Sequence, residues 1–339
     1  MNDIFDNKLW LAPLAGYTDT VYRKICKSMG ADVVMSEMIS ADALIHNNPK
    51  IKMLAEFDKE ERPIGLQIFG NDAHKISEGI KILMEYQPNF VDINMGCPVK
   101  KIVKNNSGSA LLKDKNKIKE IVKLSYKTIN DKLPLTVKIR AGWNSDKDLF
   151  EIVKIIQSEG ASAIIFHPRT RDEMFSGKSN WNLITKVKEN STIPIIGNGD
   201  ITTPEDAKIM FAQTKCDSIM VGRGAIGNPW IFRQIKNYLQ NNTYQTILPP
   251  EKIEMIFFHF KRLKEKIGSK KALQIIRKFI APYTKGIRGA SVLRQKCNQA
   301  NDEKQFIKYL LSFQTEADFC QSGSASGMTP QADKSIQKK

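Results

Sequence analysis

Short runs of apolar and β-branched residues alternate along the chain with longer segments whose apolar positions repeat at helical spacing. Eight such runs begin at Leu9, Asp32, Pro63, Phe90, Leu135, Ser162, Ile193 and Asp217. The segments between them, such as 73–87, 115–129 and 148–160, carry the apolar stripe of a helix that packs on a sheet. The pattern therefore predicts alternating strands and helices.

Eight strand–helix units over about 230 residues match the size of an α/β fold, the (β/α)8 or TIM barrel. An open, doubly wound sheet is the alternative. After the eighth unit, helical patterns follow one another with no strand between them. We therefore predict a barrel over residues 1–243 and a small all-helical domain over 244–313. The Ser-, Gly- and Gln-rich stretch 314–339 is expected to be a disordered tail.

The charge of the chain is strongly basic and unevenly distributed. Its 339 residues carry a formal net charge of +16 at pH 7, and residues 251–313 contribute +10 of it, with 15 Lys and Arg against 5 Asp and Glu. An excess of this size favours a polyanionic partner such as nucleic acid, although an AT-rich genome with lysine-heavy coding would raise it too.

Several classes of protein are excluded by the sequence. No apolar run approaches the roughly 20 residues that span a membrane, and the acidic N-terminus lacks the pattern of a signal peptide, so we expect a cytoplasmic protein. The cysteines are far apart, with no Cys-x-x-Cys pair and no histidine at ligand spacing, which argues against disulfides and a metal site. They are Cys26, Cys97, Cys216, Cys297 and Cys320. A monomer is expected.

Polar residues interrupt the apolar runs near the ends of four neighbouring strands. Because alternate residues of a strand share a face, these side chains are predicted to point inward where a barrel keeps its site. They are Gln67, Asn94, Lys138 and His167. A carboxylate such as Glu37 or Asp92 could satisfy any one of them, because a buried lysine or histidine needs a partner. Their convergence favours a ligand site instead.

Glycine-rich turns follow the last two predicted strands, at 197–200 (GNGD) and 222–227 (GRGAIG). Each alone could be a simple tight turn. Loops at these two positions of a barrel commonly hold a phosphate, because glycine lets backbone N–H groups approach the anion. With Arg223 beside them, the two turns together indicate a phosphorylated cofactor.

Cys97 directly follows the fourth strand, in a turn shaped by Gly96 and Pro98. A buried, inert cysteine is the ordinary interpretation and suits Cys26, Cys216 and Cys297 better. At the mouth of a barrel a neutral thiol can instead donate a proton, whereas a nearby Lys138 would favour the thiolate. We predict a chemical role, with the working state of the thiol left open.

A series of motifs resembles the tRNA-dihydrouridine synthases, most of all their bacterial B-type, strongly over residues 8–240 and weakly beyond. The motifs are APLAGYTD (12–19), SEM (36–38), QIFG (67–70), DINMGCP (92–98), SGSALL (107–112), VKIRAGW (137–143), HPRTR (167–171), NGDI (198–201) and VGRGAIGNPW (221–230). Leu14 stands where methionine is common, a volume-conserving change.

The resemblance implies a barrel with bound FMN that reduces the C5=C6 bond of uridines in tRNA, with NADPH as the reductant. By position it assigns Cys97 as the general acid and Asn94 as the residue that holds the uracil. The residues matched to the flavin ring are Pro13, Leu14, Ala15, Gln67, Lys138 and His167. Those matched to the phosphate and ribityl end are Asn198, Gly199, Asp200, Gly222 and Arg223.

Basic residues near the site and in the helical domain are the candidates for tRNA contacts, although a solvated charged face would explain many of them singly. They are Lys100, Lys101, Arg169, Arg171, Lys278 and Arg288. Two other functions stay open. One is a flavin-dependent oxidoreductase of a free pyrimidine base, and the other is a tRNA-binding module without catalysis.

Overall fold

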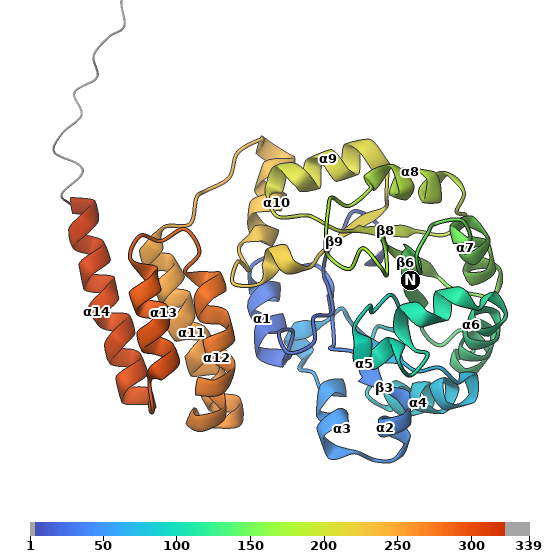
Figure 1. Ribbon diagram of the computed structural model, residues 1–339, viewed down its shortest axis with the longest axis horizontal. Coiled ribbons are helices and arrows are strands. Elements are labelled where there is room, and N and C mark those ends of the chain that lie inside the picture. Colours follow the sequence, from blue (N-terminus) through green and yellow to red (C-terminus); the bar gives the residue numbers. More distant parts are fainter. Residues whose placement is uncertain (1–3, 323–339) are drawn as a thin grey trace, which may run out of the picture. The chain divides into compact units, whose positions relative to one another are not determined.

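The computed structural model describes residues 4–322, and the chain divides into two compact units, one up to Gln245 and one from Thr246. This division lies close to the domain boundary predicted after residue 243. The first unit holds the strands together with helices α1 to α10, and the second holds helices α11 to α14 (Figure 1).

Parallel strands form the first unit's barrel, as the sequence predicts. Within the described residues, eight of them follow one another in the order β1-β9-β8-β7-β6-β5-β4-β2. A bridge between Trp10 and Val33 joins β1 to β2, so the sheet closes on itself. A short additional strand, β3, pairs with β4. The strands are β1 (Leu9–Leu11), β2 (Val34–Met35), β3 (Ile39–Ser40), β4 (Ile64–Phe69), β5 (Phe90–Met95), β6 (Leu135–Gly142), β7 (Ala163–Thr170), β8 (Ile195–Asn198) and β9 (Ser218–Val221).

Amphipathic helices surround the barrel and bury their apolar stripes against it (Figure 1). They are α1 (Thr20–Ser28), α2 (Ala41–Ile45), α3 (Pro49–Ala55), α4 (Ala73–Glu85), α5 (Lys100–Val103), α6 (Lys115–Ile129), α7 (Leu149–Ser158), α8 (Trp181–Glu189), α9 (Pro204–Thr214) and α10 (Ile231–Asn241). Side chains cap the N-termini of several of these helices. Asp114, for example, accepts a hydrogen bond from the N–H of Lys117 at the start of α6.

Aromatic rings fill part of the barrel interior. The ring of Trp10 lies 6.0 Å from that of Phe5 and 5.1 Å from that of Phe90, centroid to centroid, and all three side chains are buried. Gly65 makes room for this cluster, because a Cβ there would lie 2.1 Å from the Phe90 ring. The interior is therefore a packed core rather than a pore.

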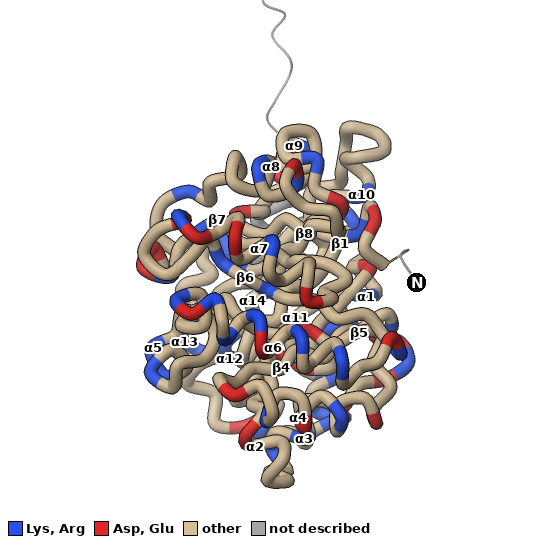
Figure 2. The backbone as a smooth tube through the Cα atoms, turned by 90° about the vertical axis from the view of Figure 1, so that its right-hand side faces the viewer, with Lys and Arg blue, Asp and Glu red and all other residues tan. Residues whose placement is uncertain are grey.

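The second unit is a bundle of helices: α11 (Pro249–Ile267), α12 (Ser269–Tyr283), α13 (Ala290–Gln299) and α14 (Glu303–Ser322). Its core includes Phe260 and Phe306, whose ring centroids lie 4.9 Å apart. Residues 251–313 of this unit carry 15 Lys and Arg against 5 Asp and Glu. Figure 2 colours the basic residues of the chain blue and the acidic ones red along the backbone. Helix α14 continues to Ser322, so the backbone of 314–322 is helical where the sequence predicted a disordered tail. The rest of that tail, 323–339, lies outside the described residues.

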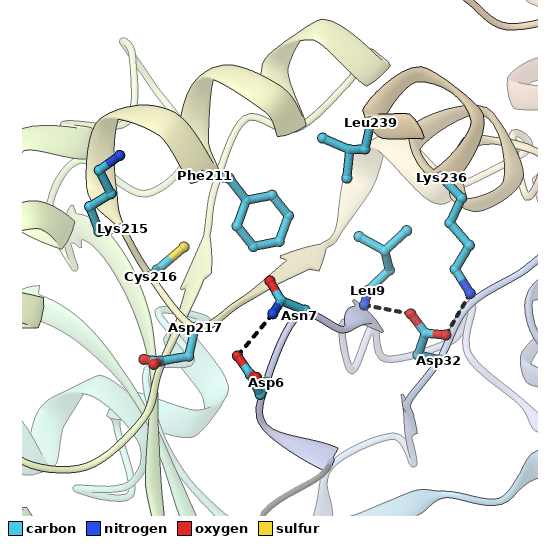
Figure 3. Close-up of a pocket in the computed structure, with 10 residues that line it drawn as sticks. All are labelled: Asp6, Asn7, Leu9, Asp32, Phe211, Lys215, Cys216, Asp217, Lys236 and Leu239. Carbon is cyan, nitrogen blue, oxygen red and sulfur yellow. Dashed lines mark hydrogen bonds and ion pairs between the residues drawn. The ribbon is translucent and has the colours of Figure 1, made fainter. Parts of the chain in front are cut away.

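A hollow of about 520 Å³ opens at the N-terminal ends of the barrel strands (Figure 3). Asp32 lies beside it and accepts hydrogen bonds from the Lys236 amine and from the N–H of Leu9. None of the residues that line it is one of the predicted site residues. Over the described part of the chain, no helix is long and apolar enough to cross a membrane.

Candidate active site at the barrel mouth

Polar side chains from neighbouring strands meet where the C-terminal ends of the strands lie, here called the barrel mouth. The strand register pairs Asn94 of β5 with Lys138 of β6, and Arg140 of β6 with His167 of β7. Gln67 of β4 is linked to Asn94, whose Nδ2 donates to Gln67 Oε1 at 2.8 Å. The structure thus brings these predicted residues to one place.

Cys97 is anchored through its backbone on both sides. Its N–H donates to Asn94 Oδ1 at 3.0 Å, and its carbonyl accepts from the N–H and the Oγ of Ser109 at 3.1 and 2.9 Å. Gly108 permits this close approach, because a Cβ there would lie 2.8 Å from the Cys97 oxygen. The SGSALL motif therefore holds the cysteine loop in place.

The electrostatics of Cys97 answer the question that the sequence left open. Burial raises the pKa of the thiol, while a hydrogen bond from Val99 and the charges of Arg140 and Lys138 act in the opposite direction and only limit the rise. The thiol therefore keeps its proton at neutral pH. A protonated, largely buried thiol at a fixed position can act as a general acid.

Lys138 is an amine held among few compensating groups. Its Nζ donates to Asn198 Oδ1 at 3.1 Å, and Asn198 is itself oriented by a bond from its Nδ2 to the Met220 carbonyl at 2.8 Å. Burial lowers the pKa of Lys138 to about 8, helped by the charge of Arg140 and opposed by that of Asp92. Such an amine would gain from an electron-rich or anionic ligand.

His167 is buried and neutral. Burial, followed by the charges of Lys138 and Arg140, holds its pKa well below the ordinary value. Arg169 Nη1 lies 3.3 Å from His167 Nε2. Because a guanidinium can only donate, Nε2 is the acceptor and the ring proton lies on Nδ1. The imidazole can therefore offer one N–H to a ligand.

Arg169 is the predicted tRNA contact whose position differs most from the expectation. Its side chain is 1% exposed and forms a two-pronged ion pair with Asp200, at 2.9 and 2.7 Å, besides donating to the carbonyls of Ser176 and Gly177. A guanidinium committed in this way is not presented to an RNA backbone. Although burial opposes it, the hydrogen bonds from Arg169 and the Ser179 N–H lower the pKa of Asp200. Asp200 thus pairs with two arginines, Arg169 and Arg223.

The two glycine-rich turns beside this ion pair differ in how closely they are packed. Gly199 has φ +127°, and a Cβ on it would meet Ser179 Oγ at 2.4 Å and the His167 ring at 2.9 Å. At Gly222 a Cβ would meet only the Ala12 Cβ, at 3.8 Å. Arg223 is half-exposed, pairs with Asp200 at 3.3 Å and lies over the Phe175 ring at 4.9 Å.

The segment after β1 forms another side of the mouth. Pro13 and Leu14 are partly buried and Ala15 is exposed. The turn is fixed by Thr18, whose Oγ1 accepts from the N–H of Leu14 at 2.9 Å. Arg23 in turn donates to the Thr18 carbonyl at 2.8 Å. The backbone of this segment is therefore held by side chains from its own loop and from α1.

The remaining basic candidates differ in their exposure. Lys100 and Lys101 are exposed on α5, three and four residues after Cys97. Arg171 pairs with Asp172 at 2.9 Å and lies over the Trp143 ring at 4.7 Å. Lys278 on α12 and Arg288 in the following loop are exposed in the second unit.

Four residues of the mouth were not singled out from the sequence as members of the site: Asp92, Thr136, Arg140 and Phe175. Arg140 is buried, donates to the Gly96 carbonyl at 2.9 Å and lies over the Phe175 ring at 5.4 Å. Strand alternation puts Thr136 and Arg140 on the same face as Lys138, and Asp92 on that of Asn94. The signal was therefore present for these three, and absent for the loop residue Phe175.

A family model described as Dihydrouridine synthase (Dus) matches residues 10–318. The chain belongs to the dihydrouridine synthase family. Among curated relatives, tRNA-dihydrouridine synthase B of Pasteurella multocida is 38% identical over 311 residues, which cover 91% of this chain and 92% of that one. Its counterpart in Pseudomonas aeruginosa is 35% identical, over 87% of this chain and 89% of the relative. The resemblance read from the motifs is thereby confirmed.

Solved structures support the fold of this family member. A histamine dehydrogenase from Rhizobium sp. 4-9 superposes with a TM-score of 0.54 at 13% identity, over 76% of this chain and 49% of that one. A 2-naphthoyl-CoA reductase gives 0.55 at 14% identity, over 68% and 50%. In the described residues, no group of three or more His, Cys, Asp and Glu side chains gathers as a metal site would require.

Proposed function

We propose that the chain is a tRNA-dihydrouridine synthase, which reduces the C5=C6 bond of uridines in tRNA with FMN as its bound cofactor and NADPH as the reductant. The observation that carries the proposal is the protonated thiol of Cys97, fixed beside Lys138 and Arg140 at the mouth of a barrel of this family. The names of the curated relatives support the same reaction.

The residues of the mouth fit FMN. The buried Oγ of Ser179 has no hydrogen-bond partner among the described residues, and it lies against Gly199 at the end of β8. At the end of the neighbouring strand β9, Gly222 leaves open space. A phosphate there would supply an acceptor and would meet the charge of Arg223. The ring would lie along Pro13, Leu14 and Ala15, with Gln67, Lys138 and His167 at its polar edge and Asn198 near the ribityl chain. When bound, FMN supplies a hydride to C6 of the uracil.

The chain itself supplies the proton. Addition of a hydride at C6 leaves the electron pair of the former double bond at C5, and the Cys97 S–H gives its proton to that carbon. The sulfur becomes a thiolate next to the positive charges of Arg140 and Lys138, which oppose the effect of burial and so stabilise it. A proton from solvent then restores the thiol.

The tRNA would be held by basic residues outside the buried mouth. Lys100 and Lys101 are exposed next to the Cys97 loop, and Lys278 and Arg288 belong to the basic helical unit. The target uridine has to leave its stack to reach the mouth, which costs a few kcal/mol that contacts to the RNA backbone can offset. We expect the protein to act as a monomer in the cytoplasm, where its tRNA substrate is found.

The test is mass-spectrometric mapping of dihydrouridine in tRNA from a strain that lacks the gene, compared with its parent. Loss at one or more defined positions is expected, and adding the purified protein with NADPH should restore it in vitro. Turnover of free uracil or orotate without RNA would favour the free-base reductase. Protein that binds tRNA but shows no flavin absorbance would favour the binding module and overturn the proposal.

A further inference from the structure

Asp92 is a buried carboxylate that has no role in the proposed reaction. It lies on β5 with no exposed surface, where Thr136 Oγ1 donates to its Oδ1 at 2.6 Å and Gln67 Nε2 donates to its Oδ2 at 2.8 Å. Burial raises its pKa to about 7, against the hydrogen bonds from Thr136 and Gln67 and the charge of Lys138. Burying a carboxylate costs free energy that an apolar residue would not cost, so its presence calls for a reason other than packing.

Asp92 is one end of a chain of hydrogen bonds that ends at the backbone of Cys97. Gln67 Nε2 donates to Asp92, Asn94 Nδ2 donates to Gln67 Oε1 at 2.8 Å, and Asn94 Oδ1 accepts from the N–H groups of Gly96 and Cys97 at 3.2 and 3.0 Å. Each side-chain amide uses its oxygen on one side and its nitrogen on the other. The orientation of one amide therefore determines that of the next.

The two ends fix the direction of the chain. A backbone N–H can only donate hydrogen bonds, and the Asp92 carboxylate can only accept them when it is ionised, as it is above its pKa of about 7. If Gln67 were turned around, its nitrogen would face Asn94, and Asn94 would have to present its oxygen to Gln67. The Asn94 nitrogen would then face the N–H groups of Gly96 and Cys97. Because two donors cannot form a hydrogen bond with each other, the loop that holds Cys97 would have to move.

We propose that Asp92 is a positioning residue, which fixes the direction of the chain through Gln67 and Asn94 and thereby holds the backbone of Cys97 in place. The same direction leaves each of the two amides one further N–H, which it can offer to a ligand with carbonyl acceptors such as a flavin or a uracil. The role in turnover rests on the proposed function, whereas the position of the Cys97 thiol can be tested without it.

Two substitutions separate the acceptor role of Asp92 from its charge and bulk. Asp92→Asn removes the charge but can still accept from Gln67 with its oxygen while its nitrogen donates to Thr136. Asp92→Leu keeps a side chain of similar length and offers no acceptor. The first readout is the rate of alkylation of Cys97 by iodoacetamide in the protein without tRNA, followed by peptide mass spectrometry. The second is kcat and KM for dihydrouridine formation on unmodified tRNA.

We expect Asp92→Asn to stay within about threefold of the parent in both readouts. Asp92→Leu should change the Cys97 alkylation rate at least about fivefold and lower kcat about 10- to 100-fold, as a misplaced catalytic group does, with KM for tRNA changed less than about threefold. Equal effects of the two substitutions, or an unchanged alkylation rate in Asp92→Leu, would overturn the proposal. If the parent forms no dihydrouridine, the proposed function fails while the alkylation contrast still decides the role of Asp92.

A second variant covers the case in which Asp92→Leu does not fold. The double substitution Asp92→Asn with Thr136→Val conserves both side-chain volumes but removes the acceptor for the amide nitrogen introduced at position 92. That nitrogen is then free to turn toward Gln67, and the chain loses its fixed direction. We expect the double variant to behave like Asp92→Leu. A double variant that alkylates and turns over like Asp92→Asn alone would contradict the inference.

Discussion

Two opposing influences act on the proton of Cys97. Burial favours the neutral thiol, and the nearby charges of Arg140 and Lys138 favour the thiolate, with burial the stronger of the two. A thiol that held its proton far more tightly would be a poor acid, and one that lost it at neutral pH would have no proton to give. Burial thus keeps the thiol protonated before the reaction, and the two cations limit the free-energy cost of the thiolate afterwards.

Replacing Cys97 with alanine should remove the proton donor and leave binding intact. We expect Cys97→Ala to retain flavin absorbance and tRNA affinity and to lose turnover by about 100-fold or more, the usual contribution of a positioned acid. Cys216→Ala is the matched control, because Cys216 is a buried barrel thiol that hydrogen bonds tie to Thr214 and Gly197. It should lose some stability but little turnover. Unchanged turnover in Cys97→Ala would refute the acid role.

The Lys138 amine should make the flavin-free protein more stable as the pH rises. Its pKa is lowered from 10.5 to about 8 in the folded chain, so between these values the unfolded chain binds more protons. The parent should therefore gain up to about 3 kcal/mol of unfolding free energy relative to Lys138→Met between pH 8 and 10.5. Urea unfolding of both proteins across this range measures the gain. A difference that does not change with pH would show that the amine is not desolvated.

At the scale of strands and loops, the alternation of residues along each strand accounts for most of the site. It predicts that the side chains of four residues point inward, because the face on which a side chain lies depends only on its position within its own strand. These residues are Gln67, Asn94, Lys138 and His167. The same alternation puts Arg169 inside with His167, yet a basic residue in a sequence does not reveal that Asp200, 31 positions later, neutralises it. Contacts between strands and loops distant in sequence, such as that of Arg140 with the Gly96 carbonyl, could not be predicted for the same reason.

The 3₁₀ helix at Gly108–Lys113 offers a test of how tightly the Cys97 loop is held. Gly108 has φ +60°, and a Cβ there would lie 2.8 Å from the Cys97 oxygen. Gly177 has φ +63°, and a Cβ added there would have nothing within 4 Å. Gly177→Ala therefore measures the cost of the left-handed backbone conformation alone. We expect Gly177→Ala to lose about 1 kcal/mol of unfolding free energy. Gly108→Ala should lose about 2 kcal/mol or more and also lose turnover. Equal losses of unfolding free energy in the two variants would mean that the Cys97 loop accommodates the extra methyl group of Gly108→Ala at no cost in stability.

At the scale of the whole molecule, charge and chemistry belong to different units. The barrel holds the Cys97 thiol, which we propose as the acid, together with Arg140 and Lys138 at its mouth, whereas residues 251–313 carry +10 of the net charge of +16. This division follows from the sequence, because a change from strand–helix alternation to helices alone marks the boundary. The extent of α14 did not follow from it, because few apolar residues in 314–322 distinguish a helix from a coil.

If the helical unit binds the tRNA backbone, specific lysines and arginines in it should contribute to the salt dependence of binding. We expect the double substitution Lys278→Gln with Arg288→Gln to weaken tRNA binding and to make the negative slope of log K against log salt shallower by about 2, one for each phosphate that is no longer neutralised.

Lys304→Gln with Lys308→Gln removes the same charge from exposed positions on α14 and serves as the control. A general effect of net charge would change both variants alike, whereas direct contacts at Lys278 and Arg288 predict a change in the first and little in the second. Filter binding or fluorescence anisotropy between about 50 and 200 mM salt distinguishes these outcomes. An unaltered slope in the first variant would exclude both residues from the RNA interface.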